Sequence, residues 1–227
     1  MQFSSSDSFV LPKVYPILDA SFIPAGTAEF RAEFLGNLGR SLTEAGVTLL
    51  EYRNKPDSDA VVFADALILR AALPARQVKL ILDDRVDVAL AAGFDGVHVD
   101  AGDLPVPVAK TLFGSLPQSV IGTSAGGEGQ LLEAIASGAD YVAFGPVFLT
   151  TTKQTSAQPI GIEGVRRFRE AAGLDAVLVA AAGITLETAP EILAAGANAV
   201  AVAAAIFDCA NPAAEFRRWI GQLQSFA

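Results

Sequence analysis

Short apolar runs alternate along this chain with longer stretches of helical periodicity. Four of these runs follow a Gly that can end a helix: AGVTLLEYR from Ala45, AGFDGVHVD from Ala92, SGADYVAFG from Ser137 and AGANAVAVA from Ala195. The glycines, at positions 46, 93, 138 and 196, are 47, 45 and 58 residues apart, which is too far for one strand–helix unit and suits two. The spacing therefore predicts one further strand in each interval.

Apolar segments of strand length occupy each of these intervals. They are KLILDD from Lys79, SVIGTS from Ser119 and AVLVAAAG from Ala176, and VYPILD from Val14 precedes the first repeat, which makes eight strands. Residues 59–73 and 129–137 have the apolar spacing of helices. Strands that alternate with helices indicate an α/β protein with a parallel sheet, and eightfold alternation favours a single (β/α)8 TIM barrel. We expect the barrel over residues 14–227, after a flexible segment at 1–13.

The composition suits one large domain and excludes some partners. The chain has 227 residues, 52% of them hydrophobic, and 16 Lys and Arg against 25 Asp and Glu give a net charge of −9. This balance argues against binding to nucleic acid or to an anionic membrane, so any phosphate must be held locally. The first residues lack the basic start and apolar core of a secretory signal, which predicts a cytoplasmic protein.

Cysteine and histidine are nearly absent. Cys209 is the single cysteine and His98 the single histidine, which excludes an intrachain disulfide framework and a zinc site of clustered Cys and His. We expect Cys209 to be a buried apolar side chain. The pattern leaves open whether the chain forms a homo-oligomer.

Polar side chains follow several of the predicted strands, at the barrel end where such proteins carry their active sites. Glu51, Arg53 and Lys55 alternate at the end of the second strand, so they share the face toward the barrel axis, where two cations require an anion. The alternative is a strand end whose charges are solvated.

Acidic residues end the next two strands. Asp83 and Asp84 end the third strand, and Asp103 follows the fourth. Carboxylates on neighbouring loops suit a hard cation such as Mg²⁺. Alternatively, Asp83 or Asp84 caps a helix that starts near Val86.

Three further positions have two interpretations or a minor role. His98 is either a general base or a packed, hydrogen-bonded side chain. Ser124 has no partner in the sequence that would activate it as a nucleophile, so we expect it to donate a hydrogen bond. The small residues around Gly183 leave room for a phosphate on backbone amides, or for close packing of helix on strand.

The stretch FGPVFLTTTK at 144–153 completes a set of motifs that resembles the thiamine phosphate synthase family. The resemblance runs from about Tyr15 to Ile206, and the residues that fit the family's motif in this stretch are Gly145, Pro146, Phe148, Thr150, Thr152 and Lys153. It implies condensation of 4-amino-2-methyl-5-pyrimidinylmethyl diphosphate with a thiazole phosphate, through a pyrimidine methyl cation and with Mg²⁺. The products are thiamine phosphate and pyrophosphate, so the partners are small molecules.

The same resemblance implies a role for each candidate residue. The diphosphate is expected on Arg53, Lys55, Lys153 and Ser124, and the metal on Asp84 and Asp103. The other substrate-binding positions implied are Glu51, Asp83, Thr150, Thr152 and Gly183.

Departures from the family pattern mark the chain as a divergent member. Glu51 stands where the family has Gln, Asp83 where it has Asn, and Ala204 where a Ser is frequent. Two alternatives therefore stay open, a barrel similar to thiazole tautomerases and a non-catalytic regulatory paralogue that binds a phosphate or thiamine compound. The first lacks its expected histidine, because Gly126 stands at that position.

Overall fold

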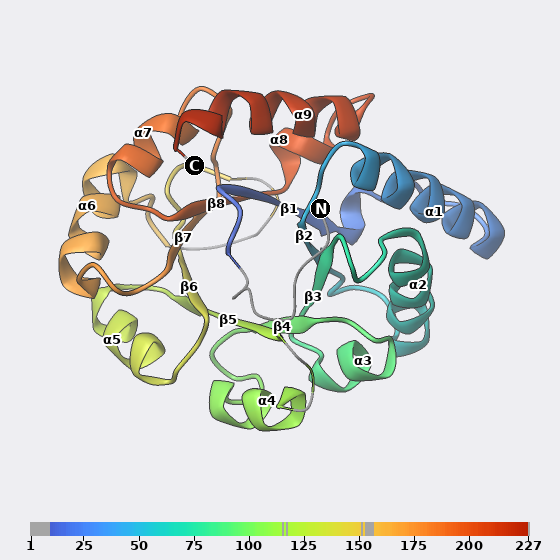
Figure 1. The fold of residues 1–227 in the computed structure, drawn as a ribbon, viewed down its shortest axis with the longest axis horizontal. Coiled ribbons are helices and arrows are strands. Elements are labelled where there is room, and N and C mark those ends of the chain that lie inside the picture. Colours follow the sequence, from blue (N-terminus) through green and yellow to red (C-terminus); the bar gives the residue numbers. More distant parts are fainter. Residues whose placement is uncertain (1–9, 115, 117, 151, 153–156, 227) are drawn as a thin grey trace.

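Eight parallel strands close into a barrel in the computed structural model, which describes residues 10–114, 116, 118–150, 152 and 157–226 (Figure 1). Each strand pairs with the next in the sequence, and the last pairs with the first. The predicted strands and the TIM barrel are confirmed. The strands are β1 Val14–Asp19, β2 Leu49–Arg53, β3 Lys79–Asp83, β4 Gly96–Val99, β5 Val120–Ala125, β6 Tyr141–Phe144, β7 Leu178–Ala181 and β8 Ala199–Val202.

Helices form a ring around the barrel (Figure 1). The helices predicted at 59–73 and 129–137 correspond to α2 and α5, with ends that differ by one residue. The α-helices are α1 Ala28–Glu44, α2 Asp59–Ala72, α3 Val86–Ala91, α4 Val106–Phe113, α5 Glu128–Ala136, α6 Gly161–Ala172, α7 Ala189–Ala194, α8 Ala204–Phe207 and α9 Pro212–Leu223, and short 3-10 turns lie at Ala20–Phe22 and Gln224–Phe226.

The four repeated glycines end helices, as the sequence predicts. Gly46, Gly93, Gly138 and Gly196 have φ angles of 92°, 71°, 80° and 115°, in the left-handed region where a side chain is strained. Each glycine follows a helix and lets the chain turn into the next strand. The repeated phrase is therefore a helix stop followed by a strand.

Alternation along each strand separates an inner layer from an outer one. On β2, Leu49 packs inside the barrel, whereas Leu50 and Tyr52 pack in the layer between the barrel and the helices. Tyr15 and Tyr141 also lie in the inner layer, and each is 1% exposed. These large side chains pack in the barrel interior beneath the carboxyl ends of the strands.

Tyr141 fits inside the barrel because its neighbour on β5 has no side chain. The strand register places Gly122 opposite Tyr141 on one side and opposite His98 on the other. A Cβ atom at Gly122 would lie 2.1 Å from Cζ of the Tyr141 ring. Gly122 therefore allows Tyr141 and His98 to meet across β5.

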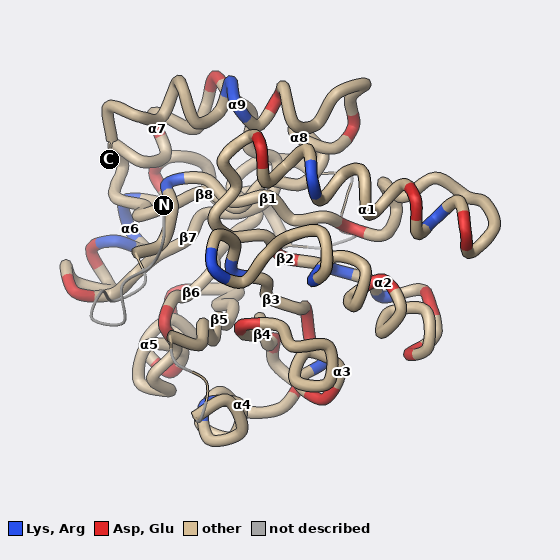
Figure 2. The backbone as a smooth tube through the Cα atoms, turned by 45° about the vertical axis from the view of Figure 1, so that its right-hand side comes forward, with Lys and Arg blue, Asp and Glu red and all other residues tan. Residues whose placement is uncertain are grey.

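The surface carries both charges interspersed, with acidic and basic positions spread over the helices and loops (Figure 2). Within the described residues, no helix is both long and apolar enough to cross a membrane. Cys209 is exposed, so the prediction of a buried cysteine was wrong. It lies in the turn between α8 and α9.

Replacing Gly122 with Ala is expected to lower the free energy of unfolding by about 1–3 kcal/mol, because the new methyl group overlaps the Tyr141 ring. Urea denaturation measures the change. Gly129→Ala is the control, because a Cβ there meets nothing within 4 Å and α5 should gain about 0.5–1 kcal/mol. Equal stability of the two variants would contradict the packing role of Gly122.

Candidate active site

A cavity of about 350 Å³ lies among the ends of the strands and the loops that follow them. This is the end of the barrel at which the sequence predicts the active site. Seven of the predicted site residues line the cavity: Glu51, Arg53, Asp83, Ser124, Thr150, Thr152 and Gly183.

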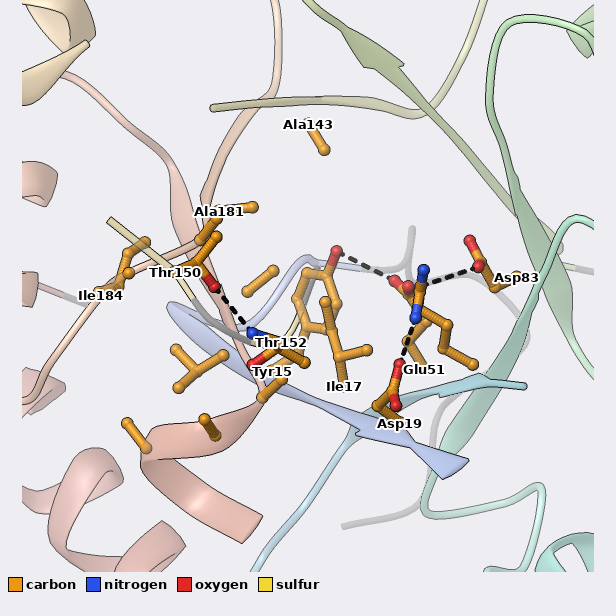
Figure 3. Close-up of a pocket in the computed structure, with 18 of the residues that line it drawn as sticks. Tyr15, Ile17, Asp19, Glu51, Asp83, Ala143, Thr150, Thr152, Ala181 and Ile184 are labelled. Atoms are coloured by element: carbon orange, nitrogen blue, oxygen red, sulfur yellow. Dashed lines mark hydrogen bonds and ion pairs between the residues drawn. The ribbon is translucent and has the colours of Figure 1, made fainter. Parts of the chain in front are cut away.

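One side of the cavity is built from the ends of β1, β2 and β3. The register pairs Arg53 with Asp19, and the Arg53 guanidinium contacts the Asp19 carboxylate directly. Its Nε also lies 3.3 Å from Oδ2 of Asp83 (Figure 3). Asp19 and Asp83 are both buried. Inward side chains at one level of three neighbouring strands therefore form a charged cluster.

Lys55 stands beside this cluster rather than in the cavity lining. Its ammonium lies 3.1 Å from Oδ2 of Asp83 and also contacts Asp84. Burial alone would lower the pKa of Lys55, but the two carboxylates raise it. The two cations that the sequence predicts on one face are therefore paired with carboxylates of the chain itself. Lys153, the third predicted cation, lies outside the described residues.

Asp84 and Asp103 form a second carboxylate pair next to Lys55. Neither Asp83 nor Asp84 caps α3, which begins after Arg85 without a side-chain cap, so the capping alternative was wrong. Asp84 has a φ of 63°, and its N–H donates to the His98 carbonyl at 2.8 Å. Burial raises the pKa of Asp103, and the adjacent Asp84 raises it further.

This pair fits a magnesium ion in its chemistry. Oδ1 of Asp84 is buried and has no hydrogen-bond partner among the described residues. Two carboxylates held close together are stabilised by a cation, and Mg²⁺ commonly takes one or two protein carboxylates together with phosphate oxygens and water. Within the described residues, no group of three or more His, Cys, Asp and Glu side chains gathers into a metal site. The fit is thus to a metal that shares its ligands with a substrate.

His98 connects the cavity to the interior of the barrel. Its Nε2 lies 2.8 Å from Oγ of Ser124 and 3.5 Å from Oδ1 of Asp100, and its Nδ1 lies 3.0 Å from the Tyr141 hydroxyl. His98 and Ser124 meet because β4 and β5 pair side by side, a contact that the sequence analysis did not predict. Asp100 and Ser124 share one ring nitrogen, which is not the arrangement of a catalytic triad.

His98 is a cation at neutral pH. Burial alone would lower its pKa, but the hydrogen bond with Asp100 and the charges of Glu51, Asp83 and Asp100 outweigh burial and raise the pKa to about 9. A protonated imidazole donates from both nitrogens and accepts no proton. The raised pKa and the two hydrogen bonds of the ring favour the packed, hydrogen-bonded interpretation over the general base.

The charge on His98 sets the direction of the neighbouring hydrogen bonds. Ser124 accepts from His98, so its own proton is free to point into the cavity. Tyr141 accepts from His98 and donates to Tyr15, and the Tyr15 hydroxyl lies 3.5 Å from Oε2 of Glu51 (Figure 3). The chain of polar groups thus runs beneath the cavity from Ser124 to Glu51.

Glu51 differs from the exposed carboxylates of the chain. It is 4% exposed, and burial raises its pKa to about 7, with His98 opposing and Asp83 adding to the rise. Glu51 therefore exists near neutral pH in both forms, as a carboxylate that accepts and as a carboxylic acid that donates.

The opposite side of the cavity carries hydroxyls and backbone. Thr150 and Thr152 lie across the cavity from Glu51 and Asp83 (Figure 3). The N–H of Thr152 donates to Oγ1 of Thr150 at 3.4 Å. The lining of the cavity thus combines the hydroxyls of the two threonines with the small side chains of Ala203–Ala205.

The backbone around position 183 requires a glycine, apart from any need to leave room for a ligand. Its φ is 71°, and a Cβ there would lie 2.6 Å from the carbonyl oxygens of Phe148 and Leu149. The loop after β6 therefore passes directly over Gly183. Gly183 lines the cavity, and its close contact is with this loop rather than with a helix; a phosphate at its backbone stays a prediction.

Tyr15, Asp19 and Tyr141 are site residues that the sequence analysis missed. Alternation in VYPILD puts Tyr15 and Asp19 on one face, so reading the end of the first strand like the others would have found Asp19. Tyr141 is the first residue of β6, and its ring contacts His98 because Gly122 has no side chain between them. A single sequence does not show which residues face each other across paired strands.

Comparison with known proteins shows the family of this chain. A family model described as thiamine monophosphate synthase matches residues 22–206. The thiamine-phosphate synthase of Koribacter versatilis is 39% identical over 208 residues, which cover 91% of this chain and 94% of the relative. That of Chloroflexus aurantiacus is 40% identical over 175 residues, 75% of this chain and 79% of the relative.

Solved structures support the same assignment. The thiamine phosphate pyrophosphorylase from Pyrococcus furiosus matches with a TM-score of 0.77 and 29% identity, over 94% of this chain and 96% of that one. Orotidine 5′-phosphate decarboxylase from Pyrococcus horikoshii, at 13% identity and a TM-score of 0.63, covers 92% of this chain and 99% of its own and shares the fold alone. The chain belongs to the thiamine monophosphate synthase family.

Proposed function

We propose that this chain condenses 4-amino-2-methyl-5-pyrimidinylmethyl diphosphate with a thiazole phosphate to give thiamine phosphate and pyrophosphate. The observation that carries the proposal is one cavity that is lined by Arg53 and Ser124 and also by the hydroxyls of Thr150 and Thr152. Membership of a synthase family adds independent support.

The reaction exchanges one bond at the pyrimidine methylene carbon. The C–O bond to the diphosphate breaks, and its electron pair leaves with the diphosphate. The lone pair of the thiazole nitrogen then forms the new C–N bond to the resulting pyrimidine methyl cation. The protein must therefore stabilise a departing anion and align two rings, with little transfer of protons.

The leaving diphosphate is proposed to bind Arg53, Lys55 and Ser124, and Lys153 by family resemblance. Arg53 and Lys55 now contact Asp19, Asp83 and Asp84, so an anion competes with these carboxylates for two cations already held in place. Arginine supplies a planar set of donors, and lysine a compact charge. Ser124 adds one donor, directed by His98.

Asp84 and Asp103 would hold Mg²⁺, which when bound neutralises negative charge on the leaving diphosphate. Oδ1 of Asp84 is buried and has no hydrogen-bond partner in the part of the chain that the structure describes, and Asp103 lies beside Asp84. The ammonium of Lys55 contacts Asp84, so Lys55 and the proposed Mg²⁺ site would face the same part of the diphosphate.

The thiazole phosphate is proposed to bind on the opposite side of the cavity. The hydroxyls of Thr150 and Thr152, the backbone at Gly183 and the first N–H groups of α8 supply donors there. Glu51 is proposed to bind the pyrimidine, donating to a ring nitrogen when protonated and accepting from the exocyclic amine when ionised.

Product formation tests the proposal directly. Purified protein, Mg²⁺ and both substrates are expected to form thiamine phosphate and pyrophosphate in equal amounts. Arg53→Met is expected to lose at least a hundredfold in kcat/KM, because a charged donor to the leaving group is removed. Binding of either substrate without product above the uncatalysed background would contradict the proposal and favour the non-catalytic alternative.

Asp83→Asn is expected to weaken the dependence of turnover on Mg²⁺. Asp83 places a buried negative charge against Arg53 and Lys55, where the diphosphate is proposed to bind, and the metal offsets this repulsion. Rate is measured against Mg²⁺ concentration, with Asp95→Asn as a control that loses the same charge next to Arg70. An unchanged Mg²⁺ requirement in Asp83→Asn would count against this role.

Activity is expected to fall as pH rises through about 9. Below that pH His98 is protonated and donates a hydrogen bond to Oγ of Ser124. The hydroxyl of Ser124 can then donate its own hydrogen bond to the diphosphate. Above it, neutral His98 can accept from Ser124, and the serine proton turns away from the cavity. The pH profile of kcat/KM measures the loss, and Ser124→Ala should lack it. The same fall in that variant would assign the titration to another group.

A further inference from the structure

A second polar cluster lies outside the cavity, between the barrel and the helices that cover β2. Its side chains come from α1, from the outer face of β2, from the loop after β2 and from α2. We refer to them together as the outer cluster, and its members are Arg31, Tyr52, Asn54, Asp57 and Asp65.

Arg31 holds two carboxylates in the outer cluster with one guanidinium. Its Nε lies 2.9 Å and 3.0 Å from the two oxygens of Asp65, and its Nη2 lies 2.7 Å from Oδ2 of Asp65 and 2.9 Å from Oδ2 of Asp57. The Asp65 side chain is only 2% exposed. Arg31 therefore joins α1 to α2 and also to the loop after β2.

Tyr52 connects Asp65 to the loop itself. Its hydroxyl donates to Asp65 and accepts from Nδ2 of Asn54 at 2.8 Å, and its ring is fully buried. Asn54 also donates to Oδ2 of Asp57 at 3.0 Å and accepts from the Asp57 N–H at 3.2 Å. Each side-chain polar atom of Asn54 thus contacts another member of the cluster.

Asn54 stands between the two cations of the proposed diphosphate site. Arg53 precedes it and Lys55 follows it, and both contact carboxylates on the cavity side of the chain. Successive side chains of an extended backbone point to opposite sides, so Asn54 contacts the outer cluster while Arg53 faces the cavity. The backbone that carries both cations is therefore held by Asn54 and Asp57 outside the cavity.

Stability alone gives little reason for this arrangement. Replacing a buried ion pair with apolar residues of similar volume is often neutral or stabilising, and Asp65 lies among buried apolar residues of α2 such as Val62, Ala66 and Leu69. The ion pair does supply fixed directions for hydrogen bonds, which an apolar side chain cannot.

We propose that Arg31, Tyr52 and Asp65 are positioning residues for the diphosphate. They hold residues 53–57 so that Arg53 and Lys55 face the same anion together. The identity of the anion rests on the proposed function, whereas the positioning of the two cations does not.

The Tyr52→Phe variant tests this positioning role, because it keeps the buried ring and the Arg31–Asp65 ion pair and removes the hydroxyl that joins Asp65 to Asn54. The dissociation constant of pyrophosphate with Mg²⁺, measured by calorimetry on the full chain, is expected to rise about fivefold, the size of one net hydrogen bond. The KM of the pyrimidine diphosphate should rise equally, and the KM of the thiazole phosphate should not change.

A matched control separates positioning from general stability. Asp95→Asn disrupts a comparable ion pair, with Arg70 at 2.7 Å, at the residue before β4 and at the other end of the barrel. It should lower the urea midpoint and leave pyrophosphate binding unchanged. Equal weakening of pyrophosphate binding in Tyr52→Phe and Asp95→Asn, or equal weakening of both substrates in Tyr52→Phe, would overturn the proposal.

Arg31→Lys gives a second test, because lysine keeps the charge but cannot bridge two carboxylates with a planar group. Pyrophosphate binding at the wild-type level in both this variant and Tyr52→Phe would also overturn the proposal. A wild-type chain that binds pyrophosphate but forms no thiamine phosphate would refute the proposed function alone, because the comparison of pyrophosphate binding among the variants stays valid.

Discussion

Closure of eight strands into one barrel forces every second side chain of each strand toward a common axis. Large side chains such as Tyr15 and Leu49 pack in that interior, and the charged side chains that line the cavity lie at the carboxyl ends of the strands. Because those ends converge, Asp19, Arg53 and Asp83 come from three strands and still share one cluster. The rest of the site depends on this convergence.

Convergence also concentrates negative charge around the buried His98 side chain. Glu51, Asp83 and Asp100 surround His98, and their combined field outweighs the cost of burying a cation. The imidazolium in turn fixes the hydrogen bonds of Ser124 and Tyr141. A histidine that looks like a candidate base in the sequence is therefore a buried counter-ion that organises donors around the cavity.

The end of β2 uses both of its faces. Glu51 and Arg53 face the cavity, while Tyr52 and Asn54 face the outer cluster. This follows from the two-residue period of an extended chain. A short segment is thus fixed from two sides, by carboxylates of β1 and β3 within the barrel and by α1 and α2 outside it.

The sequence by itself determined the barrel, its eight strands and seven of the residues that line the cavity. Periodicity, helix-ending glycines and polar strand ends are local signals, and the loop motif at 144–153 tied them to one family. Tertiary structure alone decided the partners. His98 with Ser124, Tyr141 with Tyr15, and Arg31 with Asp65 are pairs far apart in sequence, and strand pairing, barrel closure and helix packing bring them together. Charge states depend on such neighbours and on burial, so they too were decided by the folded structure.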